Sequence, residues 1–162
     1  MMPLCRTIPL LAAIAFATAA CGPKPDAAVQ RDLHRYEQQL AKIAPIESEG
    51  AEANKRATGN PKGNDATYAV VIQKEIIPAF RAYAAALDCI RPMTNELLGL
   101  HAILVKRTET VIAGFVELER SARTGDKAVI EKATALFNEG KLLYRRWSEE
   151  MDALHKRYPP ET

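Results

Sequence analysis

The spacing of apolar residues after position 26 predicts four amphipathic helices. In the first, apolar side chains from Val29 to Ile43 recur at steps of three and four, which is the period of one helix face. Pro45 is expected to end this helix, because proline disfavours helical geometry in the residue before it. The stretch 47–65 is rich in Ser, Gly, Thr and Asn and predicts a long flexible loop, which is either functional or disordered.

A second helix is predicted between 65 and Pro92, with apolar positions again three or four residues apart. Pro78 lies inside this pattern, where it removes one backbone donor and crowds the carbonyl four residues earlier. We therefore expect a kink near Lys74 or a break into two helices. The alanines within 82–86 have small side chains, which permit close packing of another helix.

The last two helices are predicted over 94–124 and 126–158, each with a continuous apolar seam. Gly125 is a natural C-terminal cap for one and Asp126 an N-terminal cap for the other, so the short connection forces an antiparallel hairpin. No stretch of the sequence shows the period-two alternation of strands. The sequence therefore predicts an all-α fold, an antiparallel up-down bundle of about four helices that forms one domain over 27–162.

Residues 1–20 have the character of a secretory signal peptide. A single basic residue, Arg6, precedes an apolar core of 13 residues from Ile8 to Ala20. A membrane-spanning helix needs about 20 apolar residues, so this segment is too short to remain in the membrane as a span. We expect it to be cleaved from the mature protein.

The end of this leader, 18–22 (TAACG), resembles the lipobox of bacterial lipoproteins. The resemblance implies cleavage before Cys21 and thioether lipidation of that cysteine, with 21–26 as a short lipid-anchored tether. Thr18 departs from the family, which usually has Leu at this position. An Asp after the cysteine favours the inner membrane in that family, so Gly22 implies the outer membrane, with the protein facing the periplasm. Ordinary signal-peptide cleavage just upstream, which would leave a free thiol, is the alternative.

Composition limits the classes of function. Removal of residues 1–20 from the 162-residue chain leaves 142 residues, enough for one domain with a core. The remainder would hold 21 Lys and Arg against 20 Asp and Glu, and this near-neutrality argues against a nucleic-acid-binding protein. Cys5 leaves with the leader and Cys21 is lipidated, so Cys89 has no disulfide partner. We interpret it as a small, half-buried residue near a helix end, with a redox or intermolecular role as the alternative.

The sequence carries no motif for catalysis or for metal binding. His155 is displaced by about 9 Å along the hairpin axis from the level of His101, which is too far for both to bind one metal, and His34 lies near the solvent side of the first helix. No Glu precedes a histidine by three residues, and no haem-attachment, nucleophile-elbow or phosphate-loop motif is present. We therefore predict no enzyme, no metal site and no cofactor other than the covalent lipid.

The last helix carries a strip of basic residues, Lys141, Arg145, Arg146, Lys156 and Arg157. Three of them have an acidic residue four positions away, and we expect these to pair: Arg145 with Glu149, Arg146 with Glu150, and Lys156 with Asp152. Such pairing favours a solvated face over a docking strip, as it does for Glu119 and Arg123 on the preceding helix. The aromatic residues Tyr144, Trp147 and Tyr158 of this helix could line a ligand pocket, but Trp147 and Tyr158 lie on the seam. Core packing is therefore favoured over a ligand pocket.

Three hypotheses of function remain. The first is a membrane-anchored envelope lipoprotein that acts without enzymatic chemistry, as a structural or interaction module for an envelope protein partner. The second is a helical bundle with a cavity for an apolar small molecule, left by the alanines within 82–86 together with Gly114 and Gly140 and lined by Phe115 and Trp147. The third is a metal or redox role for the lone thiol and the histidines.

Overall fold

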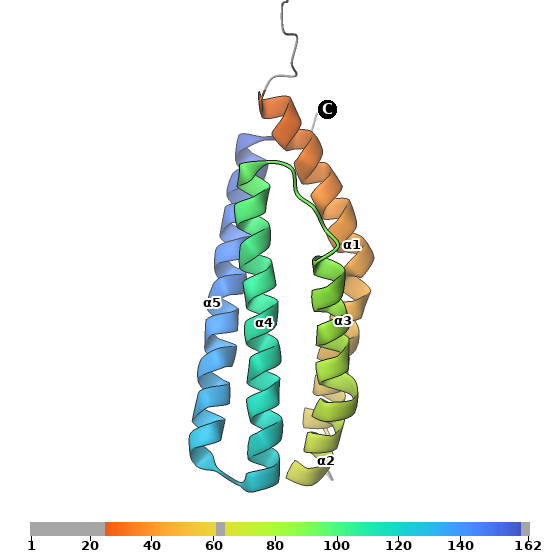
Figure 1. Ribbon diagram of the computed structural model, residues 1–162, viewed down its shortest axis with the longest axis vertical. Helices are drawn as coiled ribbons and strands as arrows, with labels where there is room; N and C mark the ends of the chain where they lie inside the picture. The colour runs from red at the N-terminus through yellow and green to blue at the C-terminus, as the bar shows by residue number, and fades with distance from the viewer. Residues whose placement is uncertain (1–24, 61–63, 160–162) are drawn as a thin grey trace, which may run out of the picture.

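The computed structural model describes residues 25–60 and 64–159, and every regular element in these two ranges is helical. Figure 1 shows that the helices form long rods that run side by side along one axis. Three rods are single helices and the fourth has three segments: α1 (Pro25–Thr58), α4 (Asn95–Thr124), α5 (Lys127–Arg157), and α2 (Asp65–Val71) with η1 (Ile72–Ile76) and α3 (Ile77–Leu87). The predicted all-α bundle is confirmed.

The predicted leader and anchor fall almost wholly outside the described residues. The signal peptide 1–20, Cys21 and the positions up to 24 are not among them. α1 begins at Pro25, so the last two residues of the predicted tether 21–26 belong to the helix. None of the described helices is apolar over a length that could cross a membrane.

The prediction of a flexible loop over 47–65 is wrong for most of that range. α1 runs through Pro45 without a break and ends at Thr58, so the connection between α1 and α2 is confined to 59–64. Asn64 caps α2, since its side chain accepts a hydrogen bond of 2.9 Å from the backbone N–H of Thr67.

Burial of one face explains why this segment is helical. Pro45 is exposed, so its ring meets solvent and not a neighbouring helix. Ile46 and Ala53 pack into the interior. Gly50 is buried, and a Cβ atom there would lie 2.9 Å from the Phe80 ring, so this glycine allows close approach of α1 and α3 and does not form a turn. Burial of large apolar side chains stabilises by about 1.5–3 kcal/mol each, which outweighs the helix-breaking composition.

Pro78 disturbs the helix near Lys74, as the sequence predicts. Residues Ile72–Ile76 form a single π-helical segment, centred on Lys74, and the rod continues on both sides of it. The N–H of Ile77 bonds to the carbonyl oxygen of Ile72, five residues earlier. Proline lacks the N–H that would continue the α-helical ladder, and the wider turn accommodates that loss.

The α4–α5 hairpin forms as predicted. Gly125 has a left-handed backbone with φ of 69°, and its N–H donates to the carbonyl of Ser121 at 2.7 Å. Asp126 caps α5 by accepting a hydrogen bond of 2.9 Å from the N–H of Ala128. The turn therefore sets two long antiparallel helices against each other.

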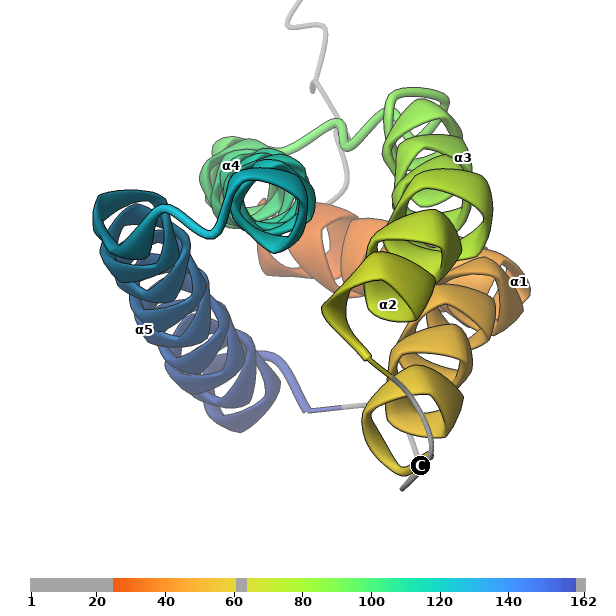
Figure 2. The ribbon, with the colours of Figure 1, turned by 90° about the horizontal axis from the view of Figure 1, so that it is seen from below.

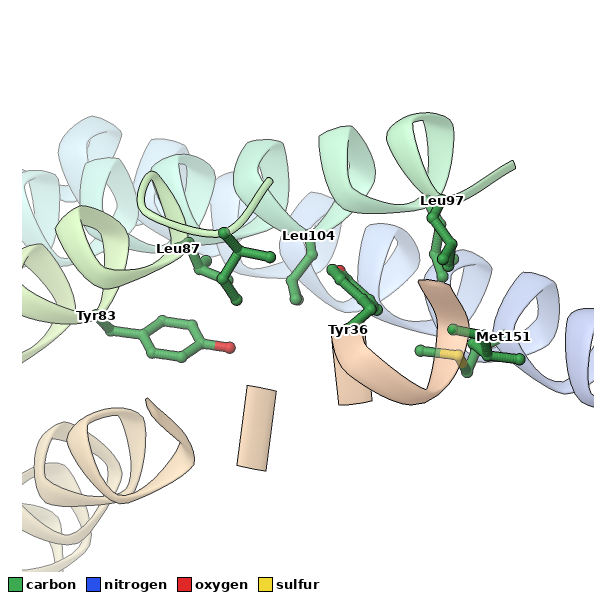
Figure 3. Close-up of a cluster of buried hydrophobic side chains, with 9 residues drawn as sticks. Tyr36, Tyr83, Leu87, Leu97, Leu104 and Met151 are labelled. Carbon is green, nitrogen blue, oxygen red and sulfur yellow. The ribbon is translucent and has the colours of Figure 1, made fainter. Parts of the chain in front are cut away.

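The interior divides into two hydrophobic clusters along the bundle. The upper core, drawn in Figure 3, collects side chains from α1, α3, α4, α5 and the α3–α4 connection: Leu33, Tyr36, Tyr83, Leu87, Ile90, Leu97, Leu100, Leu104 and Met151. The lower core lies toward the α4–α5 turn: Ala53, Ile72, Ile76, Ile77, Phe80 and Phe115. α5 adds Met151 to the upper core, whereas its contribution to the lower one is the partly buried Phe137.

The upper ends of α1 and α5 are joined by polar contacts. Gln30 Nε2 donates to the carbonyl of Pro159 at 2.8 Å, and His155 Nε2 is hydrogen-bonded to Glu37 Oε1 at 2.7 Å. Toward the other end the two helices diverge, as Figure 2 shows from below. The cleft described below lies on this side of the bundle, which is called the open side.

Candidate functional site

A cleft of about 830 Å³ lies on this open side, between the lower half of α1 and the middle of α5. This volume falls within the range of about 300–1,000 Å³ typical of small-molecule sites. Its apolar lining comes from α2, α3, α4 and α5: Tyr68, Phe80, Val111, Phe115, Leu118 and Phe137. Its polar lining comes from α1, α4 and α5: Asn54, Arg107, Lys141, Tyr144, Arg145, Ser148 and Glu149.

Helical periodicity builds the floor of the cleft. Arg107, Val111, Phe115 and Leu118 follow one another at steps of four, four and three, so they share one face of α4. The Phe115 ring stacks on Phe80 at 5.5 Å between centroids and meets Phe137 edge to face at 4.9 Å. Three helices therefore contribute one continuous aromatic surface, whose geometry is favourable for ring packing.

Two glycines set the spacing of α4 and α5 beside this floor. A Cβ atom at Gly114 would lie 2.8 Å from the Phe137 ring, and one at Gly140 would lie 3.0 Å from Val111 Cγ2. The predicted cavity at these glycines is wrong in detail, because a neighbouring side chain occupies the space beside each of them. The cleft results from the divergence of α1 and α5, although Gly140 does line it.

A polar network borders the upper end of the cleft. Arg107 pairs with Glu47 of α1, and its guanidinium lies over the Tyr144 ring at 5.4 Å from the centroid. Burial raises the pKa of Tyr83, and the negative charge of Glu47 adds to the shift, so this phenol stays protonated. On the side of the cleft formed by α1 and α2, Tyr68 donates a hydrogen bond of 2.6 Å to Asn54 Oδ1.

Two cations of the cleft have no ion-pair partner among the described residues. Lys141 and Arg145 are exposed, and the predicted pair between Arg145 and Glu149 does not form. The predicted Lys156–Asp152 pair does not form either, since each of these flexible side chains extends into water. The predicted pairs that do form are Arg146 with Glu150 at 2.7 Å, and Arg123 with Glu119.

The structure separates the three histidines. His34 is exposed and contacts Gln38, and His155 contacts Glu37. His101 Nδ1 lies 3.3 Å from the Tyr36 hydroxyl at the edge of the upper core. Burial lowers the pKa of His101 and raises the pKa of Tyr36 to about 12, so the two groups meet as neutral partners. No cluster of three potential metal ligands occurs in 25–60 or 64–159.

Cys89 is exposed and not half-buried, which corrects the sequence interpretation. α3 ends at Leu87, so the thiol follows the helix and leaves the core, and its Sγ donates to the carbonyl of Ala85 at 3.4 Å. The aromatic residues of α5 also separate. Tyr158 is buried and Trp147 packs on the upper core, whereas the half-exposed Tyr144 lines the cleft.

Sequence reasoning did not assign Phe137, Arg107 or Tyr68 to the site. Phe137 follows a residue of the predicted seam, and the antiparallel register about Gly125 places it close to the level of Gly114. That register could have predicted that the Phe137 ring packs against Gly114. The alanines within 82–86 and Trp147, both predicted around a cavity, do not line the cleft.

Comparisons of this chain with protein-family models, with curated proteins and with solved structures found no match.

Proposed function

We propose that this chain is a lipid-anchored binding module of the bacterial envelope, and that the cleft between α1 and α5 takes an apolar small molecule. The observation that carries the binding function is the cleft of about 830 Å³ with an aromatic floor. An apolar guest gains about 0.8 kcal/mol for each methylene group that it removes from water. The polar groups at the margin would fix the orientation of the guest.

The proposal extends the second hypothesis drawn from the sequence and moves its site. Phe115 is common to the predicted and observed linings, whereas Phe80 and Phe137 replace Trp147. Trp147 nevertheless stacks on Tyr144 at 5.7 Å, and it is the one Trp of the chain. Its fluorescence is therefore a built-in reporter of a guest that reaches Tyr144.

Binding of the neutral fluorophore N-phenylnaphthylamine to the purified protein tests the cleft. Ala51→Phe adds a ring at an exposed lining position of α1, and we expect it to weaken binding about tenfold. Ala44→Phe makes the same change at an exposed position of α1 that does not line the cleft, and it should bind as the parent does. Absence of binding, or equal affinities of both variants, would overturn the proposal.

The anchor rests on the leader and on Cys21, and it has its own test. The sequence places Cys21 four residues before Pro25, where α1 begins. Expressed in a bacterial envelope with a labelled fatty acid, the chain should carry the label and sediment with membranes. Cys21→Ser should carry no label, and a parent protein without label, or a labelled Cys21→Ser protein, would contradict lipidation of Cys21. An envelope protein partner stays a prediction.

A further inference from the structure

The charged groups of the cleft lie on α4 and α5. Its lining holds three cations, Arg107, Lys141 and Arg145, and one carboxylate, Glu149. Glu47 already neutralises Arg107. The two cations without an ion-pair partner are therefore both on α5, four residues apart, which puts them next to each other along one helix face, about 6 Å apart in rise.

Lys141 has no acidic neighbour on its own helix face. The positions three and four residues away hold Asn138, Tyr144, Phe137 and Arg145. Arg145 has Glu149 one turn later, but the two side chains are not within ion-pair distance. Two adjacent like charges destabilise a helix by a few tenths of a kcal/mol, and a bound anion would relieve that repulsion.

The cations and the aromatic floor lie at different levels of the cleft. Phe137 is one turn below Lys141 and two turns below Arg145 on α5, and it contacts Phe115 at 4.9 Å. A molecule lying along α5 would therefore meet rings with one end and positive charge with the other. Ser148 lines the cleft one turn above Arg145 and supplies a hydroxyl donor.

We propose that the cleft binds a single-chain amphiphile with a carboxylate head, its apolar chain on Phe115 and Phe137 and its head between Lys141 and Arg145. This inference rests on the proposed binding function and adds the chemical class of the ligand. The planar fork of Arg145 matches a carboxylate, and the ammonium of Lys141 adds a point charge. Glu149 repels an anion at the Ser148 end, so the head lies toward Lys141.

Displacement of bound N-phenylnaphthylamine by two amphiphiles of equal chain length tests the inference on the purified protein. We expect monomeric dodecanoate to displace the fluorophore about tenfold more effectively than dodecyltrimethylammonium. The double variant Lys141→Gln, Arg145→Gln should lose this preference, measured as the ratio of the displacing concentrations of the two amphiphiles within that variant. Lys127→Gln, Lys156→Gln removes two exposed, unpaired cations of α5 that do not line the cleft, and it should keep the preference.

The outcomes separate this inference from the function on which it rests. Equal displacement by the two amphiphiles, with the fluorophore bound, overturns the anionic ligand and leaves an apolar site. A preference that survives in the Lys141→Gln, Arg145→Gln protein also overturns it, since the selectivity would then arise elsewhere. A parent protein that binds no fluorophore overturns the proposed function itself.

Discussion

At the scale of single residues, Asp32 holds two distant parts of the chain together. Its buried carboxylate accepts hydrogen bonds from the N–H of Met93 at 2.7 Å, the N–H of Thr94 at 2.8 Å and the Thr94 hydroxyl at 3.0 Å. Arg35 neutralises it from the same helix at 2.5 Å. Thr94 occupies the N-cap position of α4 without making a side-chain cap of its own, and Asp32 ties this position and the residue before it to α1.

Asp32→Ala is expected to lower the free energy of unfolding by about 2 kcal/mol, because it leaves the part-buried N–H groups of Met93 and Thr94 without their acceptor and Arg35 without its partner. Urea unfolding followed by circular dichroism measures this change. Asp152→Ala is the matched control on α5, where the side chain is exposed and has no partner, and it should change stability by less than about 0.5 kcal/mol. Equal effects of the two substitutions would contradict the role of Asp32 in joining α1 to the start of α4.

The half-buried His101, which lies beside the buried Tyr36, predicts a pH dependence of stability. Burial lowers the pKa of His101 in the folded state, so the unfolded chain binds this proton first as the pH falls. The folded state is therefore fully favoured above the ordinary histidine pKa of about 6.5 and loses stability below it. His101→Gln should reduce the loss of urea midpoint between about pH 7.5 and about pH 5.5. An unchanged pH dependence in this variant would show that other groups cause it.

At the scale of the helices, the sequence predicts a feature correctly where residues next to one another in the chain determine it. Gly125 and Asp126 form a turn by their own backbone and side chain, and Pro78 disturbs the residues just before it. The helix end predicted at Pro45 and the loop predicted around Gly50 are wrong, because contacts with α3 stabilise the helix around them. A glycine that avoids a clash with a distant ring looks the same in sequence as a glycine in a loop.

Gly50→Ala tests whether this glycine is needed for the close approach of α1 and α3. In an exposed helix interior the change from Gly to Ala stabilises by about 1 kcal/mol. At Gly50 the new Cβ atom would lie 2.9 Å from two atoms of the Phe80 ring and 3.3 Å from Ala79 Cβ, so we expect net destabilisation of about 1–3 kcal/mol. Gly99→Ala is the control, since no atom lies within 4 Å of its added Cβ, and it should stabilise α4. Thermal unfolding of both variants decides, and a stabilised Gly50→Ala protein would contradict the close contact.

At the scale of the whole molecule, the sequence predicts the bundle but not its open side. Each amphipathic seam shows which face is buried, and the short α4–α5 turn fixes one antiparallel pair. The cleft depends instead on the angle between α1 and α5, which are joined through Gln30 with Pro159 and through Glu37 with His155 at one end. That angle arises from side chains of four rods together, and no local pattern encodes it.

The same arrangement sets the cleft far from the proposed anchor. Ala51 lies on the cleft, 26 residues along α1 from Pro25, which corresponds to about 39 Å at the rise of an α-helix. A lipid on Cys21 would be attached near the opposite end of that helix. In the proposed function, the binding site is therefore presented away from the membrane surface, where it can exchange its guest with the aqueous phase.

The open side also predicts unequal dynamics along α5. Its upper part packs on α1 and α4 through Trp147, Met151 and Leu154. Its lower part buries the smaller Val129, Ala133 and Gly140, and the side chain that it adds to the lower core is the partly buried Phe137. A helix segment packed on fewer neighbours opens more readily. Hydrogen exchange read by mass spectrometry should therefore show faster exchange of amides in 133–141 than in 143–151, both of which lie away from the frayed helix ends. The difference should shrink when the cleft is occupied by dodecanoate, and equal exchange of the two segments in the free protein would mean that the lower half is closed in solution.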